Sequence, residues 1–352
     1  MDIKIMRCGE MSAARLDAIV GGFGRVDITV IGDYCLDRYG EGEVKGVSRE
    51  TGDPIGKLWW HSFAPGGCGN VACNVASLGA RVRAASVLGS DDFGAVILHH
   101  LVEAGIAVDG VVQDPNRITG SYEKLQIADA EGGAREVRVD VDNKQPVSQE
   151  AERRLLDEIG NAVEWRQAIV AADYNEVAVG VLTEAVTRAI AQAGANKDLL
   201  VAAISRTRVI DFAPAMLVVN EYEACHATGV AAPGIFDDVP DAVTARAAQA
   251  LVERTGRPSF VTMGSRGVLV TRTDGTATRV ATMEPHGPID ITGAGDSALA
   301  GIVLSLAVGA SPEEAAIIGN LAAYVTIHKV RAAGTATPAE LREAHAMALD
   351  AR

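Results

Sequence analysis

The residues best suited to chemistry lie near the C-terminus, in the segment DITGAGDSALAGIVLSL at Asp290–Leu306. A strand-like piece ends there, TGAG forms a turn, and an apolar helix begins. Because Gly293, Ala294 and Gly295 leave the backbone bare, its N–H groups can approach a phosphate closely, and a helix N-terminus favours an anion. Asp296 follows at the same turn, where a carboxylate can accept a proton from an attacking hydroxyl. The alternative is that Asp296 serves only as a helix N-cap.

A second glycine-rich turn, APGGCGNVACNVASLGA at Ala64–Ala80, also opens a predicted helix. Gly66 and Gly67 allow the backbone to approach a ligand. Asn70 offers both a donor and an acceptor, which suits a polyol. The alternative is a tight turn in which Asn70 caps the helix.

Acidic residues follow the first predicted strand, VDITVIGD, in the sequence GDYCLD. In open α/β sheets ligands bind beyond the carboxyl ends of the strands, so Asp33 and Asp37 are candidates to accept sugar hydroxyls. Arg38 could pair with Asp37 or contact a substrate phosphate. The alternative for Asp37 is an ordinary acid of a loop or cap.

The segment VVNEYEAC carries an amide and a carboxylate three residues apart, Asn220 and Glu223, just after a predicted strand. At a helix start these positions share a face, and together they could hold a hydrated Mg²⁺. The alternative is a capping box, in which the same two residues only satisfy the helix N-terminus.

Composition narrows the class of protein and of partner. The 46 acidic residues outnumber the 32 Lys and Arg, and a net charge of −14 argues against nucleic acid or an anionic membrane as partner. The chain has no apolar run of about 20 residues and no signal-peptide pattern at its start. Its cysteines form no C-x-x-C pair, which favours reduced thiols in a cytoplasmic protein; they are Cys8, Cys35, Cys68, Cys73 and Cys225.

Strands and helices alternate after residue 148, which predicts a mostly parallel sheet with helices on both faces. Helices are expected at 149–161 and 179–193, and three more begin at Ala294, Pro312 and Pro338. Two β-rich segments, at about 39–65 and 110–142, interrupt this pattern, and the second contains a probable hairpin around Gly132-Gly133. We expect a single α/β domain over 1–352, with these two segments forming a small β lid.

The order of these motifs resembles that of the PfkB, or ribokinase-like, carbohydrate kinases. GDYCLD, PGGCGNVA, NEYE, VTMGSRG and DITGAGD occur in that order, and the resemblance covers roughly residues 26–340. It implies a ribokinase-like fold with a β lid, ATP as phosphoryl donor and Mg²⁺ as cofactor. It also implies a homodimer through the lid, whose aromatic residues Trp59, Trp60, Phe63 and Tyr122 would pack the lid sheet or the interface.

The resemblance also implies roles for individual residues. Asp296 would be the catalytic base, beside an anion hole of Gly293, Ala294 and Gly295. Substrate-binding candidates are Asp33, Asp37, Arg38, Gly66, Gly67 and Asn70. Nucleotide-binding candidates are Asn220, Thr262, Gly264, Gly267 and Asn320. Asn220 and Glu223 would organise Mg²⁺ through water, and Asp290 marks a candidate site for K⁺.

Within the family the motifs look most like the D-glycero-D-manno-heptose-7-phosphate kinase branch, which phosphorylates the anomeric hydroxyl of a sugar that already carries a distal phosphate. Arg38, Arg49 and Lys124 are candidates to contact that phosphate. The chain departs from the branch at VSRETGDPIG, at Ile204 and Ser205, and in AADYNEV at Asn175, where a lysine-glycine usually follows. The rival hypotheses are a nucleoside kinase of the same superfamily and a non-catalytic sugar or nucleotide sensor.

Overall fold

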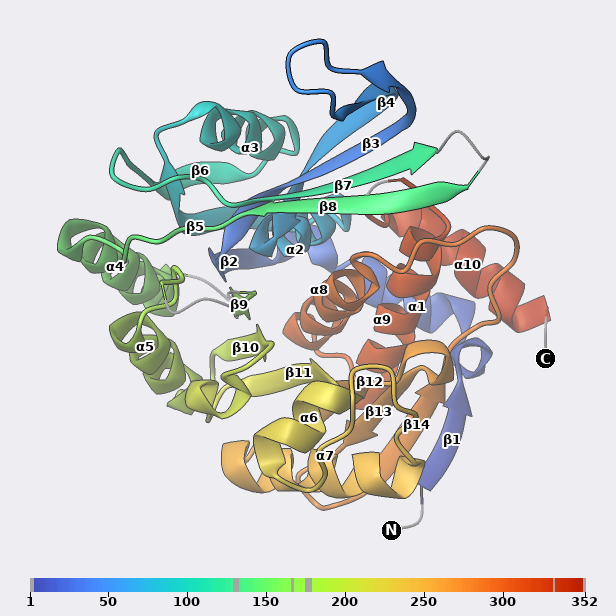
Figure 1. The fold of residues 1–352 in the computed structure, drawn as a ribbon. Coiled ribbons are helices and arrows are strands. Elements are labelled where there is room, and N and C mark those ends of the chain that lie inside the picture. Colours follow the sequence, from blue (N-terminus) through green and yellow to red (C-terminus); the bar gives the residue numbers. More distant parts are fainter. Residues whose placement is uncertain (1–2, 129–132, 166–167, 175–178, 332, 351–352) are drawn as a thin grey trace.

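Apolar strands form the central sheet of this computed structural model, which describes residues 3–128, 133–165, 168–174, 179–331 and 333–350 (Figure 1). The strand order is β1-β14-β13-β12-β11-β10-β9-β2-β5-β6. Neighbouring strands run parallel except where β13 pairs with β12 and β14. The sheet comprises β1 (Ile3–Arg7), β2 (Asp27–Gly32), β5 (Arg81–Gly89), β6 (Ala107–Asp114), β9 (Ala168–Asp173), β10 (Leu200–Ser205), β11 (Met216–Asn220), β12 (Ser259–Thr262), β13 (Val268–Thr271) and β14 (Ala277–Ala281).

Helices cover both faces of this sheet, as the alternating pattern predicts. One hydrophobic core joins the sheet to α1 (Ala13–Val20), α2 (Cys68–Ser77), α3 (Asp92–Glu103), α8 (Ala294–Ala307), α9 (Pro312–Ile327) and α10 (Pro338–Asp350). A second core lies under α4 (Gln149–Trp165), α5 (Glu184–Ala195), α6 (Glu221–Thr228) and α7 (Asp241–Thr255). Strand β9 is buried throughout because it is covered from both sides. No helix in the described parts of the chain could span a membrane.

A second sheet of four strands projects over one end of the central sheet (Figure 1). Its order is β4-β3-β7-β8, with β3 (Tyr34–Val47), β4 (Pro54–Gly67), β7 (Ser121–Ala128) and β8 (Ala134–Val141). We call it the lid sheet. Since side chains alternate between the two faces of a strand, the pairing register decides which residues face the body of the protein.

The two faces of the lid sheet differ in chemistry. Asp37 pairs with Tyr122, which pairs with Asp140, and this row faces the body. The adjacent row, Arg38, Phe63, Glu123 and Val139, faces the other way. The outward face carries exposed apolar side chains: Phe63 is 39% exposed, Val137 43% and Val139 47%. The lid sheet is therefore amphipathic, with its polar face toward the interior of the molecule.

Several predicted boundaries need correction. The second lid segment does not begin at 110, because Gly110–Asp114 belong to β6 at the edge of the central sheet. The first lid segment begins before residue 39, because β3 starts at Tyr34 and includes Asp37, which is therefore not an acid of a loop or cap. Strands β1 and β14 were not expected; they are short and lie at one edge of the sheet. Gly132 lies outside the described residues, although β7 and β8 do pair antiparallel.

Candidate active site

A cavity of about 130 Å³ lies between the polar face of the lid sheet and the start of α8. Seven of the residues singled out in the sequence line it: Asp37, Gly67, Asn70, Tyr122, Lys124, Gly293 and Asp296. They come from β3, the end of β4, α2, β7 and the start of α8. Segments that are far apart in the chain thus meet at one cavity.

Asp296 lies in the first turn of α8, and both of its carboxylate oxygens accept hydrogen bonds. The side-chain Nδ2 of Asn70 donates to Oδ2 at 2.6 Å, and the hydroxyl of Tyr174 donates to Oδ1. Burial raises the pKa of Asp296 to about 6, although these two hydrogen bonds favour the charged form and lower it. Near neutral pH the group is therefore largely a carboxylate that can accept a proton.

Gly293 makes room for the contact between Asn70 and Asp296. It is the N-cap residue of α8 and adopts a left-handed conformation with φ 78°. A Cβ at this position would lie 2.5 Å from Nδ2 of Asn70. The glycine is required by backbone conformation and by space, in addition to any role in binding an anion.

Asp37 points into the same cavity, against a glycine of the neighbouring strand. A Cβ on Gly66 would lie 2.6 Å from the carboxyl group of Asp37, so this orientation depends on glycine. Burial raises the pKa of Asp37, and the nearby Lys124 lowers it by a smaller amount. Asp37 thus offers a buried acceptor for hydroxyl groups.

Three cationic side chains line the cavity as well. Lys124 lies on β7, Arg138 on β8, and Arg206 just after β10. Arg138 also pairs with Asp140 at 2.8 Å, and the guanidinium of Arg206 lies 5.5 Å from the centre of the Tyr174 ring. In a chain of net charge −14, this concentration of positive charge favours an anionic ligand.

Arg38 does not line this cavity, contrary to the prediction that it could contact a substrate phosphate. It lies next to Asp37 on β3, so its side chain emerges from the opposite face of the lid sheet. There it forms an ion pair with Glu123 at 3.0 Å and stacks on Phe63 and Phe93. Of the candidates for contacting a phosphate, Lys124 is the one on the cavity side.

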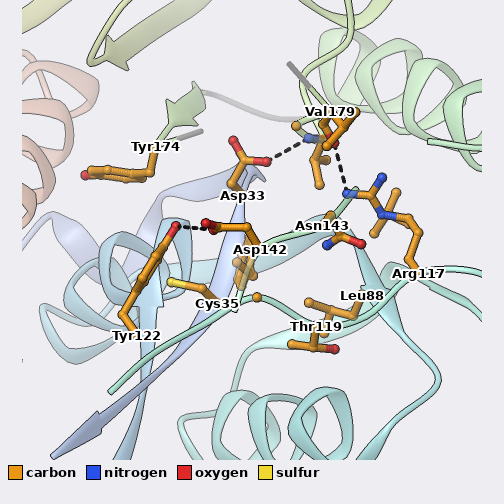
Figure 2. Close-up of a pocket in the computed structure, with 15 residues that line it drawn as sticks. Asp33, Cys35, Leu88, Arg117, Thr119, Tyr122, Asp142, Asn143, Tyr174 and Val179 are labelled. Atoms are coloured by element: carbon orange, nitrogen blue, oxygen red, sulfur yellow. Dashed lines mark hydrogen bonds between the residues drawn. The ribbon is translucent and has the colours of Figure 1, made fainter. Parts of the chain in front are cut away.

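Asp33 lies at a second, smaller cavity of about 50 Å³, which borders the first at Tyr122 and Tyr174 (Figure 2). Its Oδ1 accepts a hydrogen bond of 2.7 Å from the backbone N–H of Val181. Burial raises the pKa of Asp33 to about 6. The structure therefore separates Asp33 from Asp37, and only Asp37 lines the cavity of Asp296.

Asn220 and Glu223 form the capping box of α6. Oδ1 of Asn220 accepts from the N–H of Glu223 at 2.8 Å, and Oε2 of Glu223 accepts from the N–H of Asn220 at 2.9 Å. Burial raises the pKa of Glu223 to about 7, and the charge of Asp296 adds to this increase. The cap accounts for both residues structurally, and it leaves the Glu223 carboxyl close enough to Asp296 to interact with it. Among the described residues, no three His, Cys, Asp or Glu cluster as metal ligands.

The remaining candidates lie around the ends of neighbouring strands. Thr262 is the register partner of Asn220 at the end of β12. Gly264 and Gly267 form the turn into β13, and a Cβ on Gly267 would lie 2.0 Å from the carbonyl oxygen of Val280. Close packing against Val280 therefore accounts for the glycine at position 267 without a bound ligand.

Asp290 and Asn320 already make contacts within the protein. The Oδ1 of Asp290 accepts a hydrogen bond of 2.9 Å from the N–H of Thr292, beside the turn that starts α8. Asn320 is buried in α9 and donates to the carbonyl of Val280 at 2.8 Å. It does not line the cavity of Asp296.

The family model of the pfkB family carbohydrate kinases matches residues 28–339 of this chain. The chain belongs to the pfkB family. It is 33% identical over 318 residues to the bifunctional protein HldE of Gluconobacter oxydans (strain 621H), covering 90% of this chain and 62% of that protein. The HldE of Azorhizobium caulinodans is also 33% identical, over 322 residues, with 90% and 64% coverage. The chain thus spans less than two thirds of the length of these relatives.

Solved structures of sugar kinases share the fold of this pfkB-family member. The ribokinase of Arabidopsis thaliana, complexed with ribose and ATP, superposes with a TM-score of 0.66 at 17% identity, covering 92% of this chain and 98% of that one. Phosphofructokinase-2 from Escherichia coli in its tetrameric inhibited form gives 0.70 at 19% identity, with 92% and 99% coverage. These superpositions confirm the predicted ribokinase-like fold, and the pfkB family match confirms the predicted class of carbohydrate kinase.

Motif analysis missed three side chains at this pfkB-family site: Tyr174, Arg138 and Arg206. In the sequence, AADYNEV and the pair Ile204 and Ser205 stand out only as departures from the heptose kinase branch, although Tyr174 and Arg206 directly follow the apolar, strand-like runs QAIVAAD and DLLVAAIS. Their position just beyond the carboxyl ends of β9 and β10 is the signal that could have identified them. Asn175, at the first departure, lies outside the described residues.

Proposed function

We propose that this sugar kinase transfers the γ-phosphoryl group of ATP to a hydroxyl of a phosphorylated sugar, with Asp296 as general base. The observation that supports it best is the composition of the cavity: the Asp296 carboxylate at a helix N-terminus faces three cationic side chains. The base suits proton removal from a hydroxyl, and the cations suit an acidic substrate.

In this mechanism the acceptor hydroxyl donates to Asp296, loses its proton to the carboxylate and attacks the γ-phosphorus. The bond from phosphorus to the bridging oxygen breaks, and ADP leaves with that oxygen. The backbone N–H groups of Gly293, Ala294 and Gly295 at the start of α8 would stabilise the charge on the transferred group. Asp37, Gly66, Gly67 and Asn70 would hold the other hydroxyls of the sugar.

Residues at the carboxyl ends of β11 and β12 are suited to the nucleotide and its metal. Asn220 and Glu223 would hold Mg²⁺ through water, because the capping box already uses oxygens of both side chains. The ion would supply positive charge to the phosphates. Thr262, Gly264 and Gly267 would border ATP, Asn320 would lie behind the adenine, and Asp290 would contribute to a K⁺ site.

The substrate we favour is a sugar phosphate, with heptose 7-phosphate as the specific candidate from the family branch. Lys124, Arg138 and Arg206 would contact its phosphate. The chain departs from the branch at Ile204 and Ser205. The next residue, Arg206, would still supply a positive charge that complements the substrate phosphate. Of the four lid aromatics named in the sequence, Tyr122 alone lines the cavity, so the lid itself offers a nucleoside one ring to stack on, and we rank that substrate second.

The lid sheet also suggests how the subunits would associate. Its outward face exposes Phe63, Val137 and Val139, while its polar face covers the cavity. Burying this apolar face against a second copy would remove it from water, and we propose a homodimer formed through the lid. All five cysteines are free thiols, which suits a cytoplasmic protein.

An acceptor screen tests the proposal. ATP consumption by the purified protein would be measured with free hexoses and pentoses, hexose phosphates, heptose 7-phosphates and nucleosides, with Asp296→Asn as control. Turnover of a phosphorylated sugar that Asp296→Asn abolishes is the expected result. Turnover of unphosphorylated sugars alone would contradict the substrate, and no turnover of any acceptor would support the sensor hypothesis.

A further inference from the structure

Tyr174 makes a direct contact with the candidate base that the functions assigned above do not use. Its hydroxyl donates to Oδ1 of Asp296, opposite the contact of Asn70 with Oδ2. We propose that Tyr174 is a positioning residue, which fixes the orientation of the Asp296 carboxylate and stabilises its ionised form. This inference rests on the proposed role of Asp296.

The backbone before Tyr174 is held rigidly by a buried polar network. Asp173 is fully buried at the end of β9, where Ser205 Oγ donates to it at 2.7 Å and Arg208 donates at 2.9 Å. Arg208 Nη2 also donates to the carbonyl of Leu182 at 2.9 Å. A buried carboxylate with this many donors is costly to disturb, so the chain leading into Tyr174 has a defined course.

Contacts on the ring restrict Tyr174 further. The ring lies beside Gly67, where an added Cβ would be 3.5 Å from Cδ2 of Tyr174, and the guanidinium of Arg206 lies 5.5 Å from its centre. Gly67 has φ +55°, a conformation that favours glycine. The ring is therefore held by a glycine and a cation, and its hydroxyl points at Asp296.

The contact leaves room for the acceptor hydroxyl. An ionised carboxylate can accept about four hydrogen bonds, of which Asn70 and Tyr174 use two. Burial and the neighbouring Asp296 raise the pKa of Tyr174 well above its ordinary value, so the phenol remains a donor at neutral pH. Tyr174 can thus stay bound while a substrate hydroxyl approaches the same carboxylate.

Other charged groups around Asp296 also influence its pKa. Asp37 from β3 and Glu223 from α6 interact with it as acids, and Arg206 opposes them. The thiols of Cys35 and Cys68 are also close, but burial raises their pKa well above the ordinary value. The test must therefore isolate the hydroxyl of Tyr174 from the general charge of the cavity.

The test compares Tyr174→Phe with Tyr122→Phe, a second tyrosine lining the same cavity whose hydroxyl lies 3.5 Å from Asp142 instead. With the acceptor that the screen identifies, kcat/KM of the wild type should fall as the pH drops through about 6, the pKa of Asp296. Loss of a hydrogen bond to a charged group should move this fall to higher pH by about one unit in Tyr174→Phe. Tyr122→Phe should leave its position unchanged.

A fall at the wild-type pH in a folded Tyr174→Phe, or a uniform loss of kcat at every pH, would overturn the proposal. If Tyr174→Phe fails to fold, a measurement that needs neither this variant nor a substrate still tests the proposal. The ultraviolet difference spectrum of wild-type tyrosines should change as Asp296 titrates, and this change should be absent in Asp296→Asn. An identical tyrosine spectrum in both proteins across this pH range would also overturn it. Failure of the acceptor screen, by contrast, would contradict the proposed function and leave this spectral test intact.

Discussion

Asn70 and Asp296, which are 226 positions apart in the chain, are joined by a hydrogen bond of 2.6 Å. The side-chain nitrogen of Asn70 lies directly beside Gly293, where an added Cβ would be 2.5 Å from it. A residue of the glycine-rich anion site therefore also determines how an amide from α2 meets the candidate base.

Gly293→Ala should displace Asn70 and lower kcat by at least about tenfold, because both the clash and the positive φ act at the base. Gly309→Ala is the matched control: Gly309 follows the other end of α8 with φ +84° and has nothing within 4 Å of an added Cβ. Both variants should lose about 1 kcal/mol of stability from backbone strain. Equal kcat in the two would contradict this role of Gly293.

Asp296→Asn should leave the fold intact and lower kcat by at least about 10²-fold, the scale of losing a general base. It should also change how stability depends on pH. The native pKa of about 6 lies above the ordinary value of 3.8, so the stability contributed by this group is full below 3.8 and is lost as pH rises through about 6. Asparagine cannot ionise.

The melting temperature of Asp296→Asn relative to wild type should therefore be higher at about pH 8 than at about pH 4. The expected change in relative stability is up to about 3 kcal/mol. Thermal melts at both values measure it, and a relative melting temperature that stays constant would show that Asp296 titrates normally in the native protein.

Arg206→Gln and Lys124→Gln should each raise KM for a phosphorylated acceptor by about tenfold, since a charge-assisted hydrogen bond is worth about 1.5–3 kcal/mol. The matched control is Arg38→Gln, because Arg38 lies on the opposite face of the lid sheet, paired with Glu123. Steady-state kinetics of the three variants measures these changes in KM. A larger rise in KM for Arg38→Gln would restore the original hypothesis for that residue.

Glu223→Gln should keep the capping box, because glutamine also accepts from the N-cap N–H, but it removes the charge. The Mg²⁺ concentration for half-maximal activity should rise about tenfold, as for loss of an outer-shell partner. Glu221→Gln provides the comparison, since Glu221 lies on the same helix and pairs with Arg266 at 2.6 Å. Superimposable Mg²⁺ titrations of wild type and Glu223→Gln would exclude Glu223 from the metal site.

Trp59→Ala should weaken self-association at least tenfold, since Trp59 is 63% exposed on the lid and buried tryptophans dominate interfaces. The sequence suggested the same role for Trp60, but its ring stacks under Arg331 at 5.7 Å, on the row of Glu41. Trp60→Ala should therefore leave association unchanged. Sedimentation of the three proteins measures this, and a monomeric wild type would remove the dimer hypothesis.

Local sequence patterns are enough to predict the class of fold and several residues of the candidate site. Helices α8, α9 and α10 begin at Ala294, Pro312 and Pro338 as expected, because glycine, serine-proline and proline signals act locally. Asp37, Gly67, Asn70, Gly293 and Asp296 were identified because their motifs occur in a distinctive order, and they line one cavity.

Which of these residues share the cavity depends on strand pairing, which local patterns do not reveal. Asp37 and Arg38 are adjacent in sequence, yet the pleat of β3 turns one toward the cavity and the other away. Tyr174 and Arg206 enter the site because β9 and β10 are paired in register, Asp173 beside Ser205. Which strands pair, and on which face of a sheet a side chain lies, depend on contacts between segments far apart in the chain. A local pattern of residues does not include these contacts.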